Sequence, residues 1–313
     1  MNALSKKLNR IVLGAVFAAP LLLGSASAFA DEAPAAAPAE AAPPYSITFN
    51  LGLYSNYIGR GNDWGDGPAV QGGVDWAHSS GFYLGTWFST IDPLTLGGAG
   101  TVTNVDPSGN PLGTGNHVET DWYGGYTHAF GPVTLGIGGL YVWYPEGEKS
   151  YHNRNQDTFE GNVNISAYGF TYTFNHAFTD WYGIGNTKRD PASALAFTNP
   201  ANVINAADDT KGAQYHEIKY ATALPFADLG FTAKVGYQRS NDICLNQKDF
   251  LIGLNRSFSL PTAGKPIEGF NAGFNYTDTF GEETCSKNTA YYTDDDGQVI
   301  NDRKFTFFIK RSW

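Results

Sequence analysis

The 313-residue sequence contains little cysteine, little methionine and a minority of positive charge. It has two cysteines, and its single methionine is the first residue. Lys and Arg number 20 against 30 Asp and Glu, and this charge of −10 argues against a nucleic-acid partner, which requires basic surface. Beyond residue 30 no apolar run approaches the ~20 residues of a membrane-spanning helix. These shortages exclude nucleic-acid-binding proteins and bundles of transmembrane helices.

The N-terminal segment has the composition of a secretory signal. Three basic residues precede the apolar run 11–23, and an Ala-Phe-Ala cleavage site follows at 28–30. We therefore predict that residues 1–30 are a cleaved signal peptide. Its removal takes away three basic residues and no acidic one, which leaves 17 basic against 30 acidic residues, a charge of −13. Residues 31–44 are rich in Ala and Pro and predict a flexible periplasmic linker.

The remainder of the chain, residues 45–313, alternates between apolar and polar residues. In the first segment Tyr45, Ile47, Phe49 and Leu51 fall on one face, with Ser, Thr, Asn and Gly on the other. A period of two is typical of a β-strand with one apolar face. Twelve such segments are predicted, near 45–53, 70–76, 82–88, 118–127, 133–143, 159–167, 176–184, 217–220, 231–238, 249–255, 270–276 and 303–313.

The connections between these segments alternate strictly in length. Short connections are AHSSG, AFGP, a turn near 174–175, PFAD and LPTAGKP, and the long ones span 59–68, 91–116, 145–157, 185–214, 240–247 and 279–300. Outer-membrane barrels have short periplasmic turns and long extracellular loops, whereas both ends of a soluble sandwich meet the same solvent. The pattern predicts an all-β, transmembrane, antiparallel up-and-down β-barrel of about 12 strands. A secreted sandwich with an aromatic core is the alternative.

Aromatic residues stand at the ends of the predicted strands. Trp143-Tyr144, Trp181-Tyr182 and Tyr237 lie beside long connections, and others lie beside short ones. Two aromatic girdles are expected of a barrel in lipid. The chain ends in Trp313 on an alternating strand, which resembles the signal recognised by the outer-membrane assembly machinery. An ordinary closing strand beside the first one is the simpler interpretation.

One stretch resembles a known family. It resembles the TorF-type porins, also called the Gcw_chp family of proteobacterial outer-membrane proteins, in Arg60-Gly61, then Ala69-x-Gln71-Gly72-Gly73, then Gly81-Phe82-Tyr83-x-Gly85-x-Trp87. DWYGGYTH at 121–128 resembles the next strand of that family. The resemblance implies a barrel and a role in transport. It supplies no ligand and no catalytic residue.

Arg60 is predicted at the outer end of the first strand. A guanidinium there is suited to a lumenal carboxylate, an anionic solute or a lipopolysaccharide phosphate. An internal ion pair that fixes the first loop is the plainer interpretation.

Charged residues on the predicted inner faces are the strongest functional signal. The candidates for pore lining are Arg60, Asp75, Glu119, Asp121, Glu160, Glu217, Lys219 and Lys234. Twelve tilted strands give a diameter of roughly 24 Å, and two side-chain layers leave on the order of 10 Å for ions or small solutes. The same charges are also compatible with a lumen closed by cross-strand ion pairs.

Catalytic and metal-binding motifs are missing from the sequence. The six histidines show no metal spacing, and G-x-S-x-G and HExxH do not occur. We expect no enzyme, no metal and no cofactor. A Ser-His lipase site at the membrane boundary, for which Ser166 and His216 are the residues to consider, stays the least favoured alternative.

The two cysteines fall in the ninth-to-tenth and eleventh-to-twelfth connections, which this topology makes adjacent on the extracellular rim. Because the chain crosses an oxidising periplasm, a Cys244–Cys285 disulfide is predicted.

The sequence thus predicts an outer-membrane porin, a passive channel for ions or small polar solutes. Its expected partners are membrane lipid, lipopolysaccharide and the assembly machinery. The alternative is a non-conducting barrel that is structural or binds a surface.

Overall fold

A computed structural model describes residues 43–65, 67–91, 117–145, 157–182, 210–225, 228–240, 246–281 and 301–313. All regular secondary structure in these ranges is β-strand. The long strands are β1 (Tyr45–Tyr54), β4 (Ala69–His78), β5 (Phe82–Thr90), β6 (Val118–Phe130), β7 (Val133–Trp143), β8 (Thr158–Ala167), β9 (Phe170–Ala177), β10 (Gln214–Ala223), β11 (Leu229–Arg239), β12 (Gln247–Leu260), β13 (Ile267–Gly281) and β14 (Lys304–Ser312). Two short strands, β2 (Ile58–Gly59) and β3 (Asn62–Asp63), form a separate sheet.

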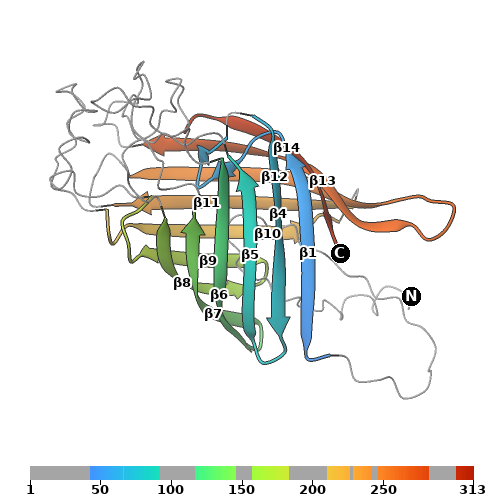
Figure 1. Cartoon of the computed structure of the whole chain (residues 1–313), viewed down its shortest axis with the longest axis horizontal. Helices are drawn as coiled ribbons and strands as arrows, with labels where there is room; N and C mark the ends of the chain where they lie inside the picture. Colours follow the sequence, from blue (N-terminus) through green and yellow to red (C-terminus); the bar gives the residue numbers. More distant parts are fainter. Residues whose placement is uncertain are drawn as a thin grey trace, which may run out of the picture.

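The long strands form one closed barrel in which each strand pairs antiparallel with its neighbours in the chain (Figure 1). The barrel closes between β1 and β14, where Phe49 and Trp313 exchange backbone hydrogen bonds of 2.9 and 3.0 Å. The predicted all-β, twelve-stranded, up-and-down topology is confirmed. Trp313 lies at the barrel seam beside the first strand, with its ring stacked on that of Phe49.

Short and long connections alternate as predicted. The five short ones are residues 79–81, 131–132, 168–169, 224–228 and 261–266. We call the end of the barrel that carries them the turn end, and the opposite end the loop end. None of the described residues forms a helix that is long and apolar enough to cross a membrane.

The seventh strand was placed wrongly by the sequence pattern. The turn lies at Tyr168-Gly169 and not near 174–175, so β9 begins at Phe170 and not near His176. Tyr168 and Gly169 have φ angles of 52° and 84°, as a two-residue hairpin turn requires. A tyrosine seldom adopts a positive φ, so this turn gives little sequence signal.

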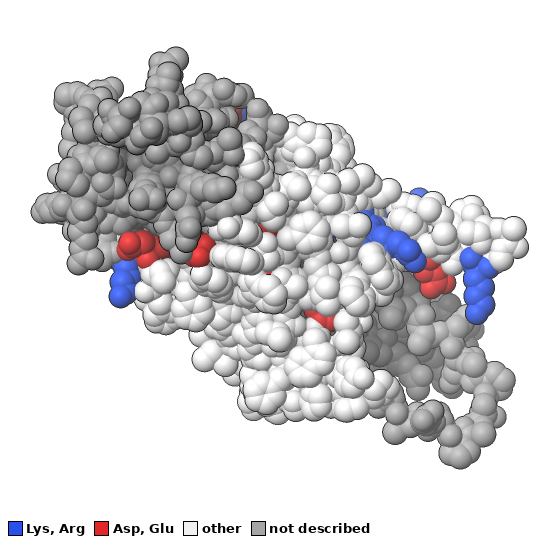
Figure 2. Space-filling view, in the orientation of Figure 1, with Lys and Arg blue, Asp and Glu red and all other residues white. Residues whose placement is uncertain are grey.

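The outer face of the barrel is apolar. On β1, β7 and β14 the outward side chains Leu53, Ile137 and Phe307 are 60%, 61% and 61% exposed. Between its two ends, the face shown in Figure 2 is almost free of charged side chains. A soluble protein rarely exposes a continuous apolar surface of this extent. The outer face is therefore the transmembrane surface, and the predicted facing of these strands is confirmed.

The inner face is polar and rich in glycine. Large inward side chains lie flat against glycines of neighbouring strands, so a Cβ atom on Gly85 would lie 2.6 Å from Cζ of Tyr123. Tyr83 covers Gly125 in the same way, with its hydroxyl 2.7 Å from the position of a Cβ. Inward tyrosines at this level thus lie against the wall, over the glycines of the neighbouring strands.

Candidate functional site: the first-loop hairpin in the lumen

The connection between β1 and β4 folds into the barrel at the loop end. We call residues 56–65, which include β2 and β3, the first-loop hairpin. Its turn is Arg60-Gly61, with φ angles of 49° and 85°, the left-handed pair of a type I′ hairpin turn. The backbone N–H of Trp64 donates to the carbonyl of Tyr57 at 2.8 Å, and its indole N–H donates to the Gly59 carbonyl at 3.2 Å. The hairpin therefore closes on itself before it contacts the wall.

Arg60 ties this hairpin to the opposite wall. Both terminal nitrogens of its guanidinium bind the Glu160 carboxylate on β8, with Nη1 at 2.8 Å from Oε1. The guanidinium also lies 4.6 Å from the ring centre of Tyr215 on β10. Burial alone would lower the pKa of Arg60, but the Glu160 carboxylate outweighs burial and raises it above its usual value. Arg60 is therefore a permanently charged anchor.

Other strands hold the backbone of the hairpin. The amide Nε2 of Gln247 on β12 donates to the Arg60 carbonyl at 2.9 Å and to Oδ1 of Asn62 at 3.1 Å. The Lys304 ammonium on β14 lies 3.1 Å from Oδ2 of Asp63. A side chain at Gly61 would meet the Cβ of Asp249 at 2.7 Å, so only glycine fits against this wall.

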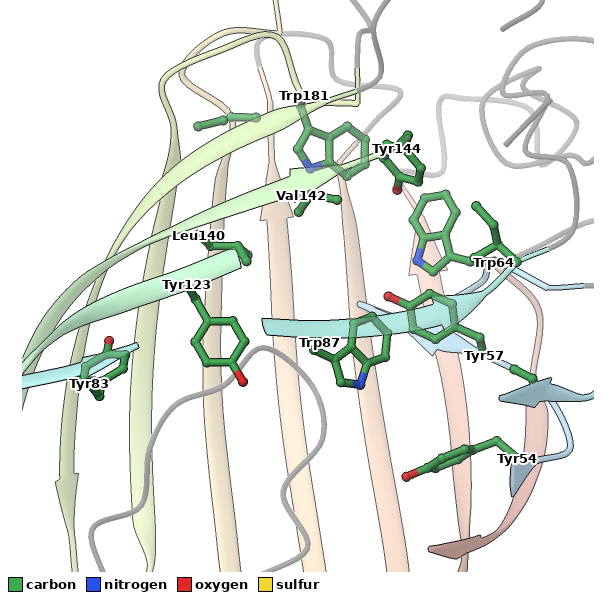
Figure 3. Close-up of a cluster of buried hydrophobic side chains, with 14 residues drawn as sticks. Tyr54, Tyr57, Trp64, Tyr83, Trp87, Tyr123, Leu140, Val142, Tyr144 and Trp181 are labelled. Atoms are coloured by element: carbon green, nitrogen blue, oxygen red, sulfur yellow. The ribbon is translucent and has the colours of Figure 1, made fainter. Parts of the chain in front are cut away.

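An aromatic cluster surrounds the hairpin (Figure 3). Tyr57 packs against Trp87, and Trp64 against Tyr182, each at a ring distance of 5.3 Å. The prediction that Tyr144, Trp181 and Tyr182 belong to a membrane girdle is wrong. Tyr144 and Trp181 are 2% exposed and point into the interior, where both pack against Tyr182, which in turn packs against Trp64 of the hairpin. Trp143 does face outward.

Five of the eight predicted pore-lining residues meet around the hairpin. Arg60, Glu119, Asp121, Glu160 and Lys234 are all buried on the inside of the barrel. Glu119 accepts hydrogen bonds from the hydroxyls of Tyr57 at 2.6 Å and Tyr144 at 2.5 Å.

The lysine on β11 joins a second group of acids. The Lys234 ammonium lies 3.0 Å from Oε2 of Glu217 and 3.5 Å from Oδ1 of Asp249. The hydroxyl of Tyr215 donates to Oδ2 of Asp249 at 2.9 Å. Lys219 is half-buried and is the register partner of Lys234, two residues beyond Glu217 toward the turn end.

Asp75 lies apart from the hairpin. It accepts a hydrogen bond from the Tyr123 hydroxyl at 2.5 Å and remains half-exposed, at the level of Gly85.

The position of Arg60 corrects one expectation. The first strand ends at Tyr54, and Arg60 lies in a turn inside the lumen. The Arg60 guanidinium forms an internal ion pair with Glu160, which was the plainer of the predicted roles. The expected width of the lumen, on the order of 10 Å, also did not include a hairpin inside the barrel.

Several residues of this site carried no sequence signal of their own. They are Tyr57, Trp64, Tyr215, Gln247 and Asp249, which alternation alone does not distinguish from their neighbours. The available signal was Trp64, a large aromatic residue in the predicted long connection 59–68.

The structure bears on the metal prediction but not on the disulfide prediction. No group of three or more His, Cys, Asp or Glu side chains in the described ranges could hold a metal ion. Cys244 and Cys285 lie outside the described residues, as does the predicted signal peptide.

Comparisons with solved structures find similar barrels at low identity. The KdgM porin matches with a TM-score of 0.43 and 7% identity, over 85% of this chain and 99% of that one. The NanC porin matches with a TM-score of 0.42 and 8% identity, over 86% and 99%. OccK5 (OpdH) of Pseudomonas aeruginosa matches with a TM-score of 0.35 and 9% identity, over 84% and 62%.

Among curated proteins, none matches the sequence. A bacterial family that is described as being of unknown function, Gcw_chp, matches residues 38–313. This range includes the whole barrel, the first-loop hairpin and the acids around it. The chain is therefore a member of the Gcw_chp family.

Proposed function

We propose that this protein is a narrow outer-membrane porin, through which small cations and small polar solutes diffuse past the first-loop hairpin. The observation that carries the proposal is a closed barrel with an apolar outer face and a polar, predominantly acidic interior. Such a barrel gives polar solutes a path through lipid that no other surface of the molecule offers. The proposal assigns no enzymatic activity.

Exposure of the inward side chains supports a funnel rather than a uniform pore. At the loop end Glu119, Glu160 and Asp249 are each 2% exposed, because the hairpin and its aromatic neighbours cover them. Toward the turn end, inward Asn50 and Thr127 are half-exposed. On β1 and β6 the inward side chains are therefore more accessible toward the turn end, and we place the constriction at the loop end, where the hairpin lies.

The constriction sets the class of solute. Six carboxylates lie around it, from Asp63, Glu119, Asp121, Glu160, Glu217 and Asp249, against the cations Arg60, Lys219, Lys234 and Lys304. A narrow passage of low dielectric amplifies fixed charge, so this excess of acid favours cations over anions.

Placement in the outer membrane completes the proposal. The short turns would face the periplasm and the loop end would face outward, where lipopolysaccharide is the neighbouring lipid. The predicted signal peptide 1–30 and the predicted linker 31–44 would belong to the export route, and the outer-membrane assembly machinery would insert the barrel.

A second candidate function is a closed, non-conducting barrel that has a structural or surface-binding role. The bidentate Arg60–Glu160 pair and the Gln247 contacts favour it, since they hold the hairpin across the lumen. This candidate shares the fold and differs only in whether the hairpin leaves a path.

Planar-bilayer conductance in a salt gradient separates the two. We compare the wild-type protein with a variant in which residues 56–66 are replaced by a Gly-Ser linker of equal length. A cation-selective wild-type conductance that grows several-fold in the variant supports the narrow porin. Conductance in the variant alone supports the closed barrel, and no conductance in either protein contradicts the channel.

A further inference from the structure

Asp121 on β6 is a buried carboxylate that the hairpin does not neutralise. Its side chain is 4% exposed, and among the described residues its Oδ1 atom has no hydrogen-bond partner. An ionised carboxylate in such a place needs a counter-charge or a hydrogen-bond donor.

The two neighbouring acids already have partners. Glu119 accepts from the hydroxyls of Tyr57 and Tyr144, and Glu160 binds the Arg60 guanidinium. Glu119 is thus hydrogen-bonded by two hydroxyls, one of them from the hairpin, and only Glu160 is neutralised by a cation of the hairpin. Glu119, Asp121 and Glu160 thus lie near a single cation, the Arg60 guanidinium, and their excess negative charge favours a further cation.

A second unpartnered polar group lies opposite Asp121. Trp87 is the register partner of Asp121 on β5 and is 5% exposed, and its indole Nε1 has no hydrogen-bond partner among the described residues. Gly73 and Val142, which flank this pair in the adjacent strands, add no side-chain donor. The indole N–H is itself a donor and binds no cation, so the feature that favours an organic cation is the face of the ring beside the carboxylate, through charge-assisted hydrogen bonds and cation–π attraction.

We propose that Asp121 and Trp87 form a recognition site for a small organic cation with a primary ammonium group. The ammonium donates to the Asp121 carboxylate and lies beside the face of the Trp87 ring. Chelation of a divalent metal does not fit, because the described residues offer no group of three ligating side chains. The proposal rests on the proposed function and deepens it, since it names the solute class that the constriction favours.

Binding is measured without reference to transport. The full-length protein in detergent is titrated with ethylammonium chloride at constant pH and ionic strength, and saturation transfer to the ethyl protons is followed by NMR. Asp121→Asn should weaken binding by about tenfold, the equivalent of one lost charge-assisted hydrogen bond. Asp121→Glu keeps the charge and should stay within about threefold of wild type.

The matched control is Asp75→Asn. Asp75 is also an inward carboxylate, but the Tyr123 hydroxyl satisfies it. Its substitution should change ethylammonium affinity less than about twofold, which shows that position and not total charge decides binding. Ethanol, a neutral analogue, should give no transfer.

Defined outcomes overturn the site. If wild type and Asp121→Asn bind ethylammonium with equal affinity, Asp121 binds a proton and not the ammonium. If saturation transfer to ethanol equals that to ethylammonium, the site does not recognise charge. If Asp121→Asn fails to fold, Trp87→Leu is the second test, and an unchanged affinity there contradicts the proposal. Binding in a protein that shows no conductance leaves this site standing while the channel function fails.

Discussion

The two ends of the lumen are built from the same strands but with different chemistry. At the loop end Glu119, Asp121 and Glu160 are buried, and two of them are bound by residues of the first-loop hairpin. Nearer the turn end, inward amides and hydroxyls bond to one another, as Asn271 donates to Oδ1 of Asn255 at 3.0 Å and to Oγ of Ser257 at 3.2 Å. Alternation alone gives a strand a polar inner face, whereas a second polypeptide segment inside the barrel is needed to bury charge there.

The orientation of these two ends gives the largest, all-or-none expectation. An epitope inserted at 100–110 or 195–205 should be labelled on intact cells, and one inserted at Ser79-Ser80 should be labelled only after permeabilisation. The reason is that the first two positions lie in long connections and the third lies in a turn-end connection. Surface labelling at Ser79-Ser80 would mean that the turn end, and not the loop end with its constriction, faces the outside of the cell.

Breaking the Arg60–Glu160 pair should open the loop end. Arg60→Ala leaves the Glu160 carboxylate buried without its partner, which costs about 3–5 kcal/mol. Because the hairpin is a local element, we expect it to leave the lumen, with higher conductance and faster proteolysis within residues 55–68. Both are measured in reconstituted protein.

The control for this variant is Arg256→Ala. Arg256 and Asp228 form an exposed pair at 3.8 Å, with side chains 62% and 91% exposed. Such a pair contributes no more than about 1 kcal/mol. If both variants behave alike, the Arg60 pair does not hold the hairpin.

The predicted Cys244–Cys285 disulfide would stiffen the loop end further. Gln247 and Gly281, which lie near the two cysteines in the chain, are direct register partners in β12 and β13. A bond there closes a ring of 41 residue steps, worth about 3–4 kcal/mol in the chain-entropy model. A non-reducing peptide map of protein made through the periplasm tests it, and two free thiols would contradict it.

The wall at the level of Gly85 should respond to a single methyl group. Gly85→Ala forces the Tyr123 ring away from the wall and toward the axis, at a cost of about 1–3 kcal/mol. Unfolding by urea in vesicles should show the destabilisation, and conductance should fall. Gly264→Ala is the control, since its nearest neighbour, Oγ1 of Thr262, is 3.9 Å away. Equal effects of the two substitutions would show that Tyr123 does not cover Gly85.

The barrel was predictable because its signals are local. A period of two fixes which side chains of β1 or β7 face lipid, and the alternation of connection lengths fixes the order of strands. Glu119, Asp121 and Glu160 were placed on the inner face for the same reason, and the structure has them there.

The hairpin was not predictable because its signal is non-local. Nothing within residues 56–65 states that Tyr57 will meet Glu119 or that Arg60 will meet Glu160, 62 and 100 residues further along the chain. Tyr144 likewise meets Glu119 inside the barrel, a non-local contact that the girdle prediction missed. The misplaced turn at Tyr168 has a local cause, since a tyrosine occupies a position where glycine or asparagine is usual.

The division of tryptophans between lumen and lipid has a spectroscopic consequence. Of the seven tryptophans, Trp64, Trp87 and Trp181 are buried inside the barrel, whereas Trp122, Trp143 and Trp313 are exposed on its surface. Brominated lipids should therefore quench the emission of the second group and spare the first. Iodide, which stays in water, should gain access to the first group only when the hairpin leaves the lumen. Quenching of tryptophan fluorescence by iodide thus reports whether the hairpin closes the constriction.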